Sequence, residues 1–550
     1  MRWIHPLTAE LDAPADVLGA KAAGLVLLRR LGLPVPPGFV IGTPAYRAFR
    51  QAGRLPDGLD AELGTAIADL ERTTGRTFGG PGRPLVVSVR SGAGVSMPGM
   101  MSTVLNVGLT TGATAGLAAE TGDPRLALDS RLGLLTSFAA ATGLDPARPA
   151  ALPETAGTAE TGDERARLSR AVEAVAAAVA DRGGPPVPDE ATAQLEQAVV
   201  AVLRSWDTPR ARTYRELHDI PHDLGTAVTV QAMVFGNRDQ HSGTGVAFSR
   251  NPDTGDPVPF GEVLFGRQGE EVVSGRSLTR PLADLAGRQP EVWTGLRQAM
   301  DQVERHYRDA CYLEFTFEAG ELWLLQVRPA RFVGAAAVRL AVNLADQGMI
   351  GRDEALRRIS PGQLRHARTP RLATGDGADL LARGRGAGPG VAVGRVATTA
   401  DRAVRMAATG PVILVRPETS PLDLHGLAAA AGVVTARGGP TSHAAVVARA
   451  MGKPAVVGIA DLVVADDAIR VAGRTIPEGT VIAVDGTGGD VVLGSPRVTT
   501  GGADPHLRQL LDWADAVSGD ASERPDAVRL DAAHAALARR REPPPERRAR

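Results

Sequence analysis

Apolar and polar positions alternate with two periods along the chain, and these periods predict helices interleaved with short strands over residues 1–344. Residues 18–33 carry apolar positions at helical spacing and lead into the turn sequence PVPP. Residues 84–109 predict a buried strand, a loop of Gly, Ser, Met and Pro, and further β-prone sequence. Residues 225–256 and 312–331 each predict two strands joined as a hairpin. This alternation indicates a multidomain protein with α/β and α+β layers.

The second part of the chain contains a small domain that the pattern sets apart. Five short β-type runs (VAVGRV, PVILV, GVVTA, PAVVG and TVIAV) accompany the helical sequence HAAVVARAM. A polar segment rich in Pro and Gly precedes them, and one helix with a polar, proline-rich tail follows. Residues 145–200 predict an exposed loop and a long helix. We therefore expect four parts: 1–344, with subdomains near 1–200 and 201–344; a helical linker at 345–385; the small domain at 386–498; and a helix with a disordered tail at 499–550.

Composition narrows the classes of protein that this chain can belong to. Hydrophobic residues make up 43% and charged residues 22%, which is typical of a soluble globular protein. A net charge of -1 and only 4% aromatic residues give no basis for binding nucleic acid. We expect no membrane span, because no uncharged stretch has an apolar core of about 20 residues, and no signal sequence opens the chain. A single cysteine excludes an internal disulfide and fits a cytoplasmic location.

Lysine occurs at only two positions, Lys21 and Lys453, while arginine supplies the other strong positive charges. A compact ammonium group makes contacts that a planar guanidinium cannot make, so both positions attract attention. Lys21 lies near the start of the first apolar helix, and Lys453 follows HAAVVARAM. On its own, Lys21 is most simply a helix lysine whose stem covers apolar surface.

Residues 438–454 read GGPTSHAAVVARAMGKP and place His443 where a loop of small residues becomes a helix. The two glycines permit a tight turn and close approach of another molecule to the backbone. Thr441 or Ser442 is expected to cap the helix, which leaves the imidazole near free N–H groups that stabilise a transferred phosphate. A solvated histidine at a helix start is the simpler alternative. The flanking residues are too small to shield the ring, and a neutral imidazole is a competent nucleophile.

The sequence VVTARGGPTSHAAVVARAMGKPAVVG, preceded by LVRPETSPLDLHGL, resembles the phosphohistidine domain of the pyruvate, phosphate dikinases and the phosphoenolpyruvate synthases. The stretches SVRSGAGVSMPGMMSTVLNVGL, VTVQAMVFGN, SGTGVAFSRNPDTG and LEFTFEAGELWLLQVR resemble the nucleotide-binding half of the dikinases. The resemblance covers roughly residues 15–515. It implies an ATP-grasp nucleotide-binding domain followed by a swivelling β/β/α phosphohistidine domain.

The resemblance also implies roles for individual residues. His443 matches the histidine that takes a phosphoryl group from ATP, with release of AMP and with inorganic phosphate as a second acceptor. Glu314 and Gln326, which face each other across the second predicted hairpin, match the Mg²⁺ site, and oxygen ligands suit that ion. The glycines on either side of Thr244 are expected to let the backbone approach the phosphates. The residues that match nucleotide or phosphate contacts are Lys21, Arg90, Thr244, Glu270 and Arg328.

Two features depart from the family pattern. The family usually has an aspartate two residues before the metal-binding glutamate, and Tyr312 occupies that position here, so we expect weaker metal binding. The dikinases also continue into a C-terminal barrel that binds pyruvate and phosphoenolpyruvate, and this chain ends where that barrel begins. We therefore expect no pyruvate site in residues 1–550, and a separate barrel protein is one candidate partner.

Several functions stay open at this point. The first is an ATP-dependent phosphotransferase of dikinase type, which uses pyruvate only if a separate barrel chain is supplied. Antibiotic phosphotransferases of the same superfamily offer a small-molecule acceptor instead, but the linker cannot hold their large substrate domain. The second is a regulatory or nucleotide-sensing phosphocarrier without complete dikinase activity. The third, a degenerate remnant, is disfavoured because Lys21, Glu314, Gln326 and His443 all match. A homodimer is also left open.

Overall fold

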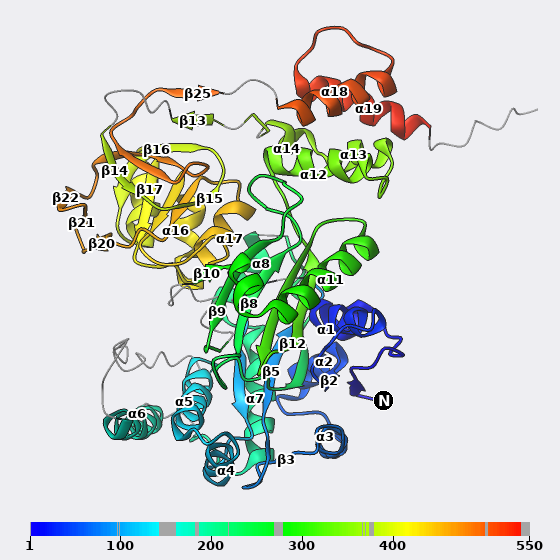
Figure 1. The fold of residues 1–550 in the computed structure, drawn as a ribbon, viewed down its shortest axis with the longest axis vertical. Helices are drawn as coiled ribbons and strands as arrows, with labels where there is room; N and C mark the ends of the chain where they lie inside the picture. Colours follow the sequence, from blue (N-terminus) through cyan, green and yellow to red (C-terminus); the bar gives the residue numbers. More distant parts are fainter. Residues whose placement is uncertain are drawn as a thin grey trace, which may run out of the picture. The chain divides into compact units, whose positions relative to one another are not determined.

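The computed structural model describes residues 2–95, 97, 100–141, 161–181, 186–217, 219–268, 279–365, 367–368, 370–372, 379–500 and 504–540. The chain divides into two compact units. Figure 1 labels their helices and strands along the sequence. The first unit comprises residues 1–242 and 316–327, and the second comprises residues 243–315 and 328–550. None of the described helices is long and apolar enough to cross a membrane.

The first unit is built on a five-stranded antiparallel sheet in the order β1-β2-β7-β5-β6. The apolar run predicted to be a helix forms α1 (Ala15–Arg30), and Leu25 and Leu28 on it are fully buried. The segment 84–109 yields two adjacent strands joined by a loop, as predicted. The strands are β1 (Ile4–Pro6), β2 (Gly38–Ile41), β5 (Val87–Gly92), β6 (Thr103–Val107) and β7 (Ala227–Ala232).

Helices make up most of the rest of the first unit. The predicted long helix of residues 145–200 is α6, which begins within the predicted exposed loop of residues 153–164; residues 153–160 of that loop lie outside the described residues. The bounds are α2 (Thr43–Ala52), α3 (Leu59–Thr74), α4 (Thr111–Thr121), α5 (Pro124–Ala141), α6 (Thr161–Asp181), α7 (Ala191–Ser205) and α8 (Pro209–Leu217), with a short strand pair β3 (Thr77–Phe78) and β4 (Pro84–Leu85).

A second five-stranded sheet has the order β10-β9-β8-β11-β12. The predicted hairpin at 312–331 is confirmed, since β11 and β12 are neighbours. The predicted hairpin at 225–256 is wrong: its strands form, but β7 pairs in the first sheet and β8 in this one. The elements are β8 (Gly243–Phe248), β9 (Phe260–Phe265), β10 (Arg280–Pro281), η1 (Leu282–Asp284), α10 (Leu285–Arg288), α11 (Pro290–Tyr307), β11 (Cys311–Glu318) and β12 (Glu321–Pro329).

The small domain contains an eight-stranded sheet in the order β14-β24-β23-β16-β17-β18-β19-β15. All five predicted strands and the predicted helix are present. The central run β16-β17-β18-β19 is parallel, so the loops that follow β17 and β18 lie at the same edge of the sheet. The bounds are β14 (Leu380–Arg383), β15 (Arg385–Gly388), β16 (Val391–Ala397), α15 (Ala400–Ala407), β17 (Val412–Arg416), η2 (Pro421–Asp423), α16 (Leu424–Ala429), β18 (Gly432–Thr435), α17 (His443–Ala450), β19 (Ala455–Val457), β23 (Val481–Asp485) and β24 (Asp490–Leu493), with a small sheet of β20 (Val463–Val464), β21 (Ala468–Val471) and β22 (Arg474–Pro477).

The segments around the small domain hold more structure than the sequence predicted. The predicted linker at 345–385 contains two helices and two strands, and β14 is an edge strand of the large sheet. The last part of the chain forms two helices rather than one, because apolar residues on the second pack into the same core as α12. The tail at 541–550 lies outside the described residues. The elements are α12 (Gly334–Asp346), α13 (Arg352–Arg358), α14 (Pro361–Arg365), β13 (Pro370–Leu372), β25 (Val498–Thr500), α18 (Pro505–Ser518) and α19 (Asp526–Arg539).

Candidate active site

His443 is the first residue of α17, at the edge of the sheet where the parallel strands β17 and β18 end. Its side chain is partly exposed, but its Nε2 atom is buried. The expectation that small neighbours leave the ring unshielded is therefore wrong for this nitrogen. Helix capping also differs from the prediction: Ser442 occupies the N-cap position, yet its side chain makes no capping hydrogen bond.

The two ring nitrogens of His443 have different surroundings. Nδ1 lies 3.1 Å from the hydroxyl of Thr419, which follows β17 and is buried. Nε2 has no hydrogen-bond partner among the residues that the structure describes. Burial lowers the pKa of His443 below its ordinary value, and the negative charge of Asp423 opposes that shift in part. The imidazole is thus neutral at physiological pH, so one of its two nitrogens carries a lone pair.

The loop before His443 is held by Glu262, a β9 residue that is only 2% exposed. One carboxylate oxygen accepts from the backbone N–H of Thr441 at 2.9 Å and from the hydroxyl of Thr441. The other accepts from the hydroxyl of Thr279. A Cβ at Gly439 would overlap the carboxylate, while Gly438 has a φ of 92° in the left-handed region. Both glycines are therefore needed, and the group that approaches Gly439 belongs to the chain itself.

Two further contacts fix α17. Arg449 is buried and pairs with Asp253 at 2.9 Å, and it also donates to the carbonyl of Pro440 at 3.2 Å. Lys453 donates to the carbonyl of Ala428 at 2.6 Å and to that of Ala430, at the C-terminal end of α16. A compact ammonium group satisfies both carbonyls of that helix end, which accounts structurally for lysine at this position.

Three of the predicted nucleotide and metal residues lie in the first unit. Gly19, with a φ of 76°, lets the start of α1 press against the backbone of Gly92, and the N–H of Ala20 donates to the carbonyl of Ala93 at 2.9 Å. This contact places Lys21 beside the end of β5, where a Cβ on Gly92 would lie 3.5 Å from the Cβ of Lys21.

Arg90, on the same strand, connects this end of the sheet to β12. Its guanidinium donates to the side chain of Gln231 and, at 3.3 Å, to the carbonyl of Leu325. Leu325 directly precedes Gln326 in the sequence. The fold of the first unit therefore brings the chain segments that carry Lys21, Arg90 and Gln326 near one another, although they are far apart in the sequence.

The second unit gathers Thr244, Glu314 and Arg328 in the same way. The buried hydroxyl of Thr244 donates to the carbonyl of Phe315 at 3.1 Å, next to Glu314. A Cβ at Gly245 would lie 2.6 Å from the Phe315 ring, so the space that this glycine leaves is filled by protein rather than open to a phosphate.

Tyr312, which replaces the family aspartate, contacts both remaining residues. Its hydroxyl donates to the Glu314 carboxylate at 3.3 Å, and the Arg328 guanidinium stacks 4.0 Å from the centre of its ring. The side chain also packs edge to face against Phe248 and is 7% exposed. Burial, followed by the charge of Glu314, raises the pKa of Tyr312, so the hydroxyl keeps its proton and its bond to the carboxylate.

The side chains on β11 and β12 limit which metal ion these strands can bind. Among the described residues, no group of three or more His, Cys, Asp or Glu side chains is arranged for a metal ion. The single carboxylate of Glu314 fits Mg²⁺ that arrives with a polyphosphate, because that ion is commonly held by one or two carboxylates together with substrate phosphates. The Tyr312 hydroxyl is then a competitor for the Glu314 carboxylate.

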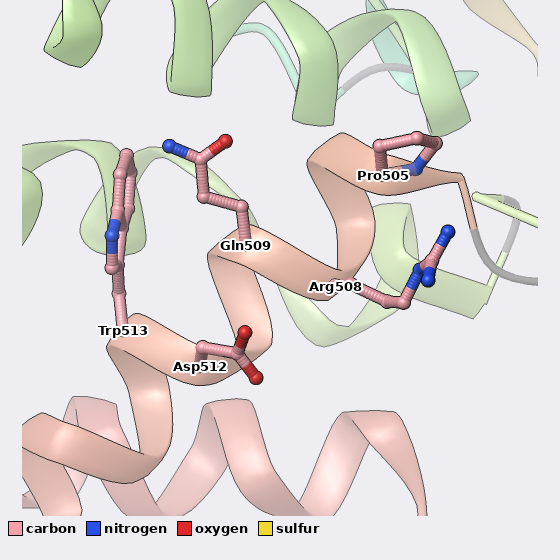
Figure 2. A pocket seen from close by; sticks show the side chains of 5 residues that line it. All are labelled: Pro505, Arg508, Gln509, Asp512 and Trp513. Atoms are coloured by element: carbon pink, nitrogen blue, oxygen red, sulfur yellow. The ribbon is translucent and has the colours of Figure 1, made fainter.

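Glu270 is outside the described residues. A hollow of about 400 Å³ lies along α18, lined by Pro505, Arg508, Gln509, Asp512 and Trp513 (Figure 2). It contains none of the predicted site residues, and Gln509 in it donates to Asp346 at 3.0 Å.

The sequence missed the two residues that contact the His443 loop most closely, Thr419 and Glu262. Thr419 lies within the family-like stretch before the histidine, so its place after a parallel strand was the available signal. A buried carboxylate such as Glu262 carries no such signal, since its role follows from which segments the fold brings together.

Comparison with known proteins identifies two domain families in the chain. The family described as "Pyruvate phosphate dikinase, AMP/ATP-binding domain" matches residues 52–280, and the one described as "PEP-utilising enzyme, mobile domain" matches residues 408–489. The chain is 40% identical over 549 residues to the pyruvate, phosphate dikinase of Rhizobium meliloti (strain 1021), covering 94% of this chain and 60% of that protein. The chain contains an AMP/ATP-binding domain of pyruvate, phosphate dikinase type and a mobile domain of PEP-utilising enzymes. The dikinase of Clostridium symbiosum is 38% identical over 530 residues, covering 94% and 60%, and chloroplastic dikinase 1 of Arabidopsis thaliana is 39% identical over 514 residues, covering 91% and 53%.

The two matched segments include some of the candidate site residues and leave others outside. The chain spans little more than half the length of these dikinases. His443, Thr419 and Asp423 lie within the matched mobile domain. Arg90, Thr244 and Glu262 lie within the matched nucleotide-binding domain, whereas Lys21 and the β11–β12 hairpin lie outside both matched segments.

Proposed function

We propose that this protein is an ATP-dependent phosphotransferase of the dikinase type, in which Nε2 of His443 is the phosphoryl acceptor. The observation that carries the proposal is the asymmetry of the imidazole. Thr419 engages Nδ1 at 3.1 Å, burial keeps the ring neutral, and Nε2 is left without a partner among the described residues. A neutral ring whose proton is on Nδ1 presents a lone pair at Nε2, and no base is needed to free it.

The proposed reaction has two transfers. The Nε2 lone pair attacks the β-phosphorus of ATP, the bond from that phosphorus to the oxygen of the α-phosphate breaks, and AMP leaves with the bonding electrons. An oxygen of inorganic phosphate then attacks the terminal phosphorus of the pyrophosphoryl group on His443. Pyrophosphate leaves, and one phosphoryl group stays on Nε2. The proton on Nδ1 stays bonded toward Thr419 throughout.

Several side chains of the chain are suited to hold the nucleotide. Lys21, Arg90 and Arg328 bring positive charge for the phosphates, and transfer of this kind depends mainly on positioning and electrostatic stabilisation. Glu314 and Gln326 would hold Mg²⁺, which would neutralise charge on the phosphates when bound. Thr244 and Glu270 would complete the nucleotide contacts. Glu262 and Arg449 would keep the His443 loop in place during the transfer.

The final acceptor of the phosphoryl group is a separate part of the proposal. By likeness to the dikinases, the acceptor is pyruvate in a barrel domain, supplied by another chain or by sequence beyond residues 1–550. The Tyr312–Glu314 hydrogen bond favours one alternative, a regulatory phosphocarrier that turns over slowly, because it occupies the carboxylate that would bind the metal. We also propose that the protein acts in the cytoplasm.

Product analysis tests the proposal. Protein, ATP, Mg²⁺ and inorganic phosphate should yield AMP and pyrophosphate in amounts that match the protein present. His443→Ala should yield neither, with unchanged thermal unfolding as the control for folding. Formation of ADP, or AMP release by His443→Ala at the wild-type level, would contradict a dikinase-type reaction at this histidine.

A further inference from the structure

The three polar side chains in the sequence Thr441-Ser442-His443 differ in their hydrogen bonding. Thr441 gives its hydroxyl to Glu262, and His443 pairs its Nδ1 with Thr419. The hydroxyl of Ser442 makes no hydrogen bond to any residue that the structure describes, although Ser442 is only 5% exposed. Two polar atoms of neighbouring residues, Ser442 Oγ and His443 Nε2, are thus buried at one end of α17 without a hydrogen-bond partner among the described residues.

A buried hydroxyl without a hydrogen bond destabilises the folded protein, because it has lost its bonds to water and gained none in their place. The ordinary partner for an N-cap serine is a backbone N–H in the first helical turn, and that bond is not made here. The backbone is nevertheless suitable for a cap, with φ −62° and ψ 163°. The backbone geometry therefore does not explain why the Ser442 side chain makes no capping hydrogen bond.

The end of α17 also offers backbone donors. Its first intrahelical bond runs from the N–H of Val446 to the carbonyl of Ser442 at 2.9 Å. The N–H groups that precede Val446 in the helix have no intrahelical acceptor, and such groups stabilise an anion. A phosphoryl group on His443, the first helical residue, would stand at this end.

We propose that Ser442 is a phosphoryl-binding residue, whose hydroxyl donates a hydrogen bond to an oxygen of the phosphoryl group on His443. This role rests on the proposed function and adds a residue to it. In the unmodified protein the hydroxyl has no hydrogen-bond partner within the described parts of the chain, and phosphorylation supplies a charged acceptor. A hydrogen bond to a charged group stabilises it more than one between neutral groups, so the bond shifts the transfer equilibrium toward the phosphorylated protein.

The test compares two N-cap residues of the same domain. Thr399 caps α15 in the usual way, accepting from the N–H of Arg402 at 3.2 Å, and serves as the matched control. Each variant, Ser442→Ala and Thr399→Ala, is equilibrated with fixed ratios of ATP, AMP, phosphate and pyrophosphate, and phosphohistidine is quantified by ³¹P NMR. Thermal unfolding of each unmodified protein is measured in parallel. Ser442→Thr keeps the hydroxyl and should restore the wild-type equilibrium.

The proposal expects opposite behaviour from the two variants. Ser442→Ala should lower the equilibrium constant for phosphorylation roughly tenfold, with a changed ³¹P chemical shift and an unchanged unfolding temperature. Thr399→Ala should lower the unfolding temperature and leave the equilibrium constant as it is. An unchanged equilibrium constant in Ser442→Ala, or a fall in unfolding temperature as large as that of Thr399→Ala, would overturn the role of Ser442. The proposed function would still stand if His443 of the wild-type protein became phosphorylated. Wild-type protein without any phosphohistidine would overturn both.

Discussion

At the scale of single residues, the chemistry of the site depends on which nitrogen of His443 is engaged. Thr419 lies 24 residues before His443, and the two side chains meet because β17 and β18 are parallel neighbours whose following loops share one sheet edge. The proposal places the ring proton on Nδ1, 3.1 Å from the Thr419 hydroxyl, and this tautomer leaves the lone pair on Nε2.

Removing that contact should slow the reaction without abolishing it. Thr419→Val keeps the shape of the side chain and removes the hydroxyl. We expect the rate of His443 phosphorylation to fall about tenfold, since one hydrogen bond that orients the ring is lost. Rapid-quench measurement with labelled ATP gives the rate. Thr419→Ser restores the hydroxyl and should recover most of it; equal rates in wild type and Thr419→Val would contradict the assigned tautomer.

The pH dependence of phosphorylation follows from the lowered pKa of His443. Only the neutral ring can attack, so the rate should fall on the acid side with a midpoint below the ordinary value of 6.5. The charge of Asp423 raises this pKa, so Asp423→Asn should lower it further and move the acid limb to lower pH. A pH–rate profile for both proteins measures this; a limb that moves to higher pH would contradict the electrostatic argument.

The residue scale also shows what could be predicted from sequence. The position of His443 at the start of a helix was predictable because small residues and a helical pattern occur together in one stretch. Lys453 was noticed for the scarcity of lysine, and the structure gives it two helix-end carbonyls at α16. The partners of Glu262 were not predictable, since it gathers hydroxyls from segments that are remote in the sequence.

At the scale of elements, β11 shows how one substitution changes a strand's chemistry. Alternate residues of a strand point to the same face, so Tyr312 and Glu314 are on one side of β11 and bond at 3.3 Å. With tyrosine at position 312, the strand has a hydroxyl in place of a second carboxylate, and that hydroxyl donates to the carboxylate of Glu314.

The hairpin should therefore respond to changes at Tyr312 through its affinity for Mg²⁺. Tyr312→Phe removes the competing hydroxyl, and we expect half-saturation at about fivefold less Mg²⁺. Tyr312→Asp adds a carboxylate and should lower the requirement further, whereas Glu314→Ala should abolish labelling. Titration of the labelling rate with Mg²⁺ distinguishes the variants. Equal, small effects from all three changes would mean that this hairpin does not bind the metal.

The contact between β9 and the loop before α17 gives a second prediction at this scale. Glu262→Gln removes the charge that accepts from both the N–H and the hydroxyl of Thr441. We expect amide hydrogen exchange in the peptide that contains Gly438 to Ser442 to become roughly tenfold faster, because bonds to a buried carboxylate are lost. A peptide from α15 serves as the internal control. Unchanged exchange in the loop would contradict the holding role of Glu262.

Elements were predicted well where the pattern was local and poorly where pairing was not. The strands of the small domain follow from their apolar runs. The pairing of β7 and β8 could not be predicted, because sequence proximity favours a hairpin while the fold assigns them to separate sheets. The helix α19 was missed because its alanine-rich face, with Leu530 and Leu537, is only weakly apolar. Its packing in one core with α18 is a long-range feature that the local pattern does not show.

At the scale of the whole molecule, each unit holds some of the residues that the proposed function uses. Lys21, Arg90 and Gln326 gather in the first unit, and Thr244, Glu314, Arg328 and His443 belong to the second. The sequence predicted these residues through family likeness, while their grouping comes from long-range packing of α1 on β5 and of β8 on β11. The central claim is that these residues serve a single event, transfer of the β-phosphoryl group of ATP to one histidine.

Labelling with ATP that carries ³²P in the β position tests that claim most directly. With Mg²⁺ and inorganic phosphate present, we predict one stable label per chain, lost in acid and retained in base, that mass spectrometry assigns to His443. The same experiment with α-labelled ATP should leave the protein unlabelled, and His443→Ala should take up no label. Label on another residue, or label that persists in His443→Ala, would contradict the account.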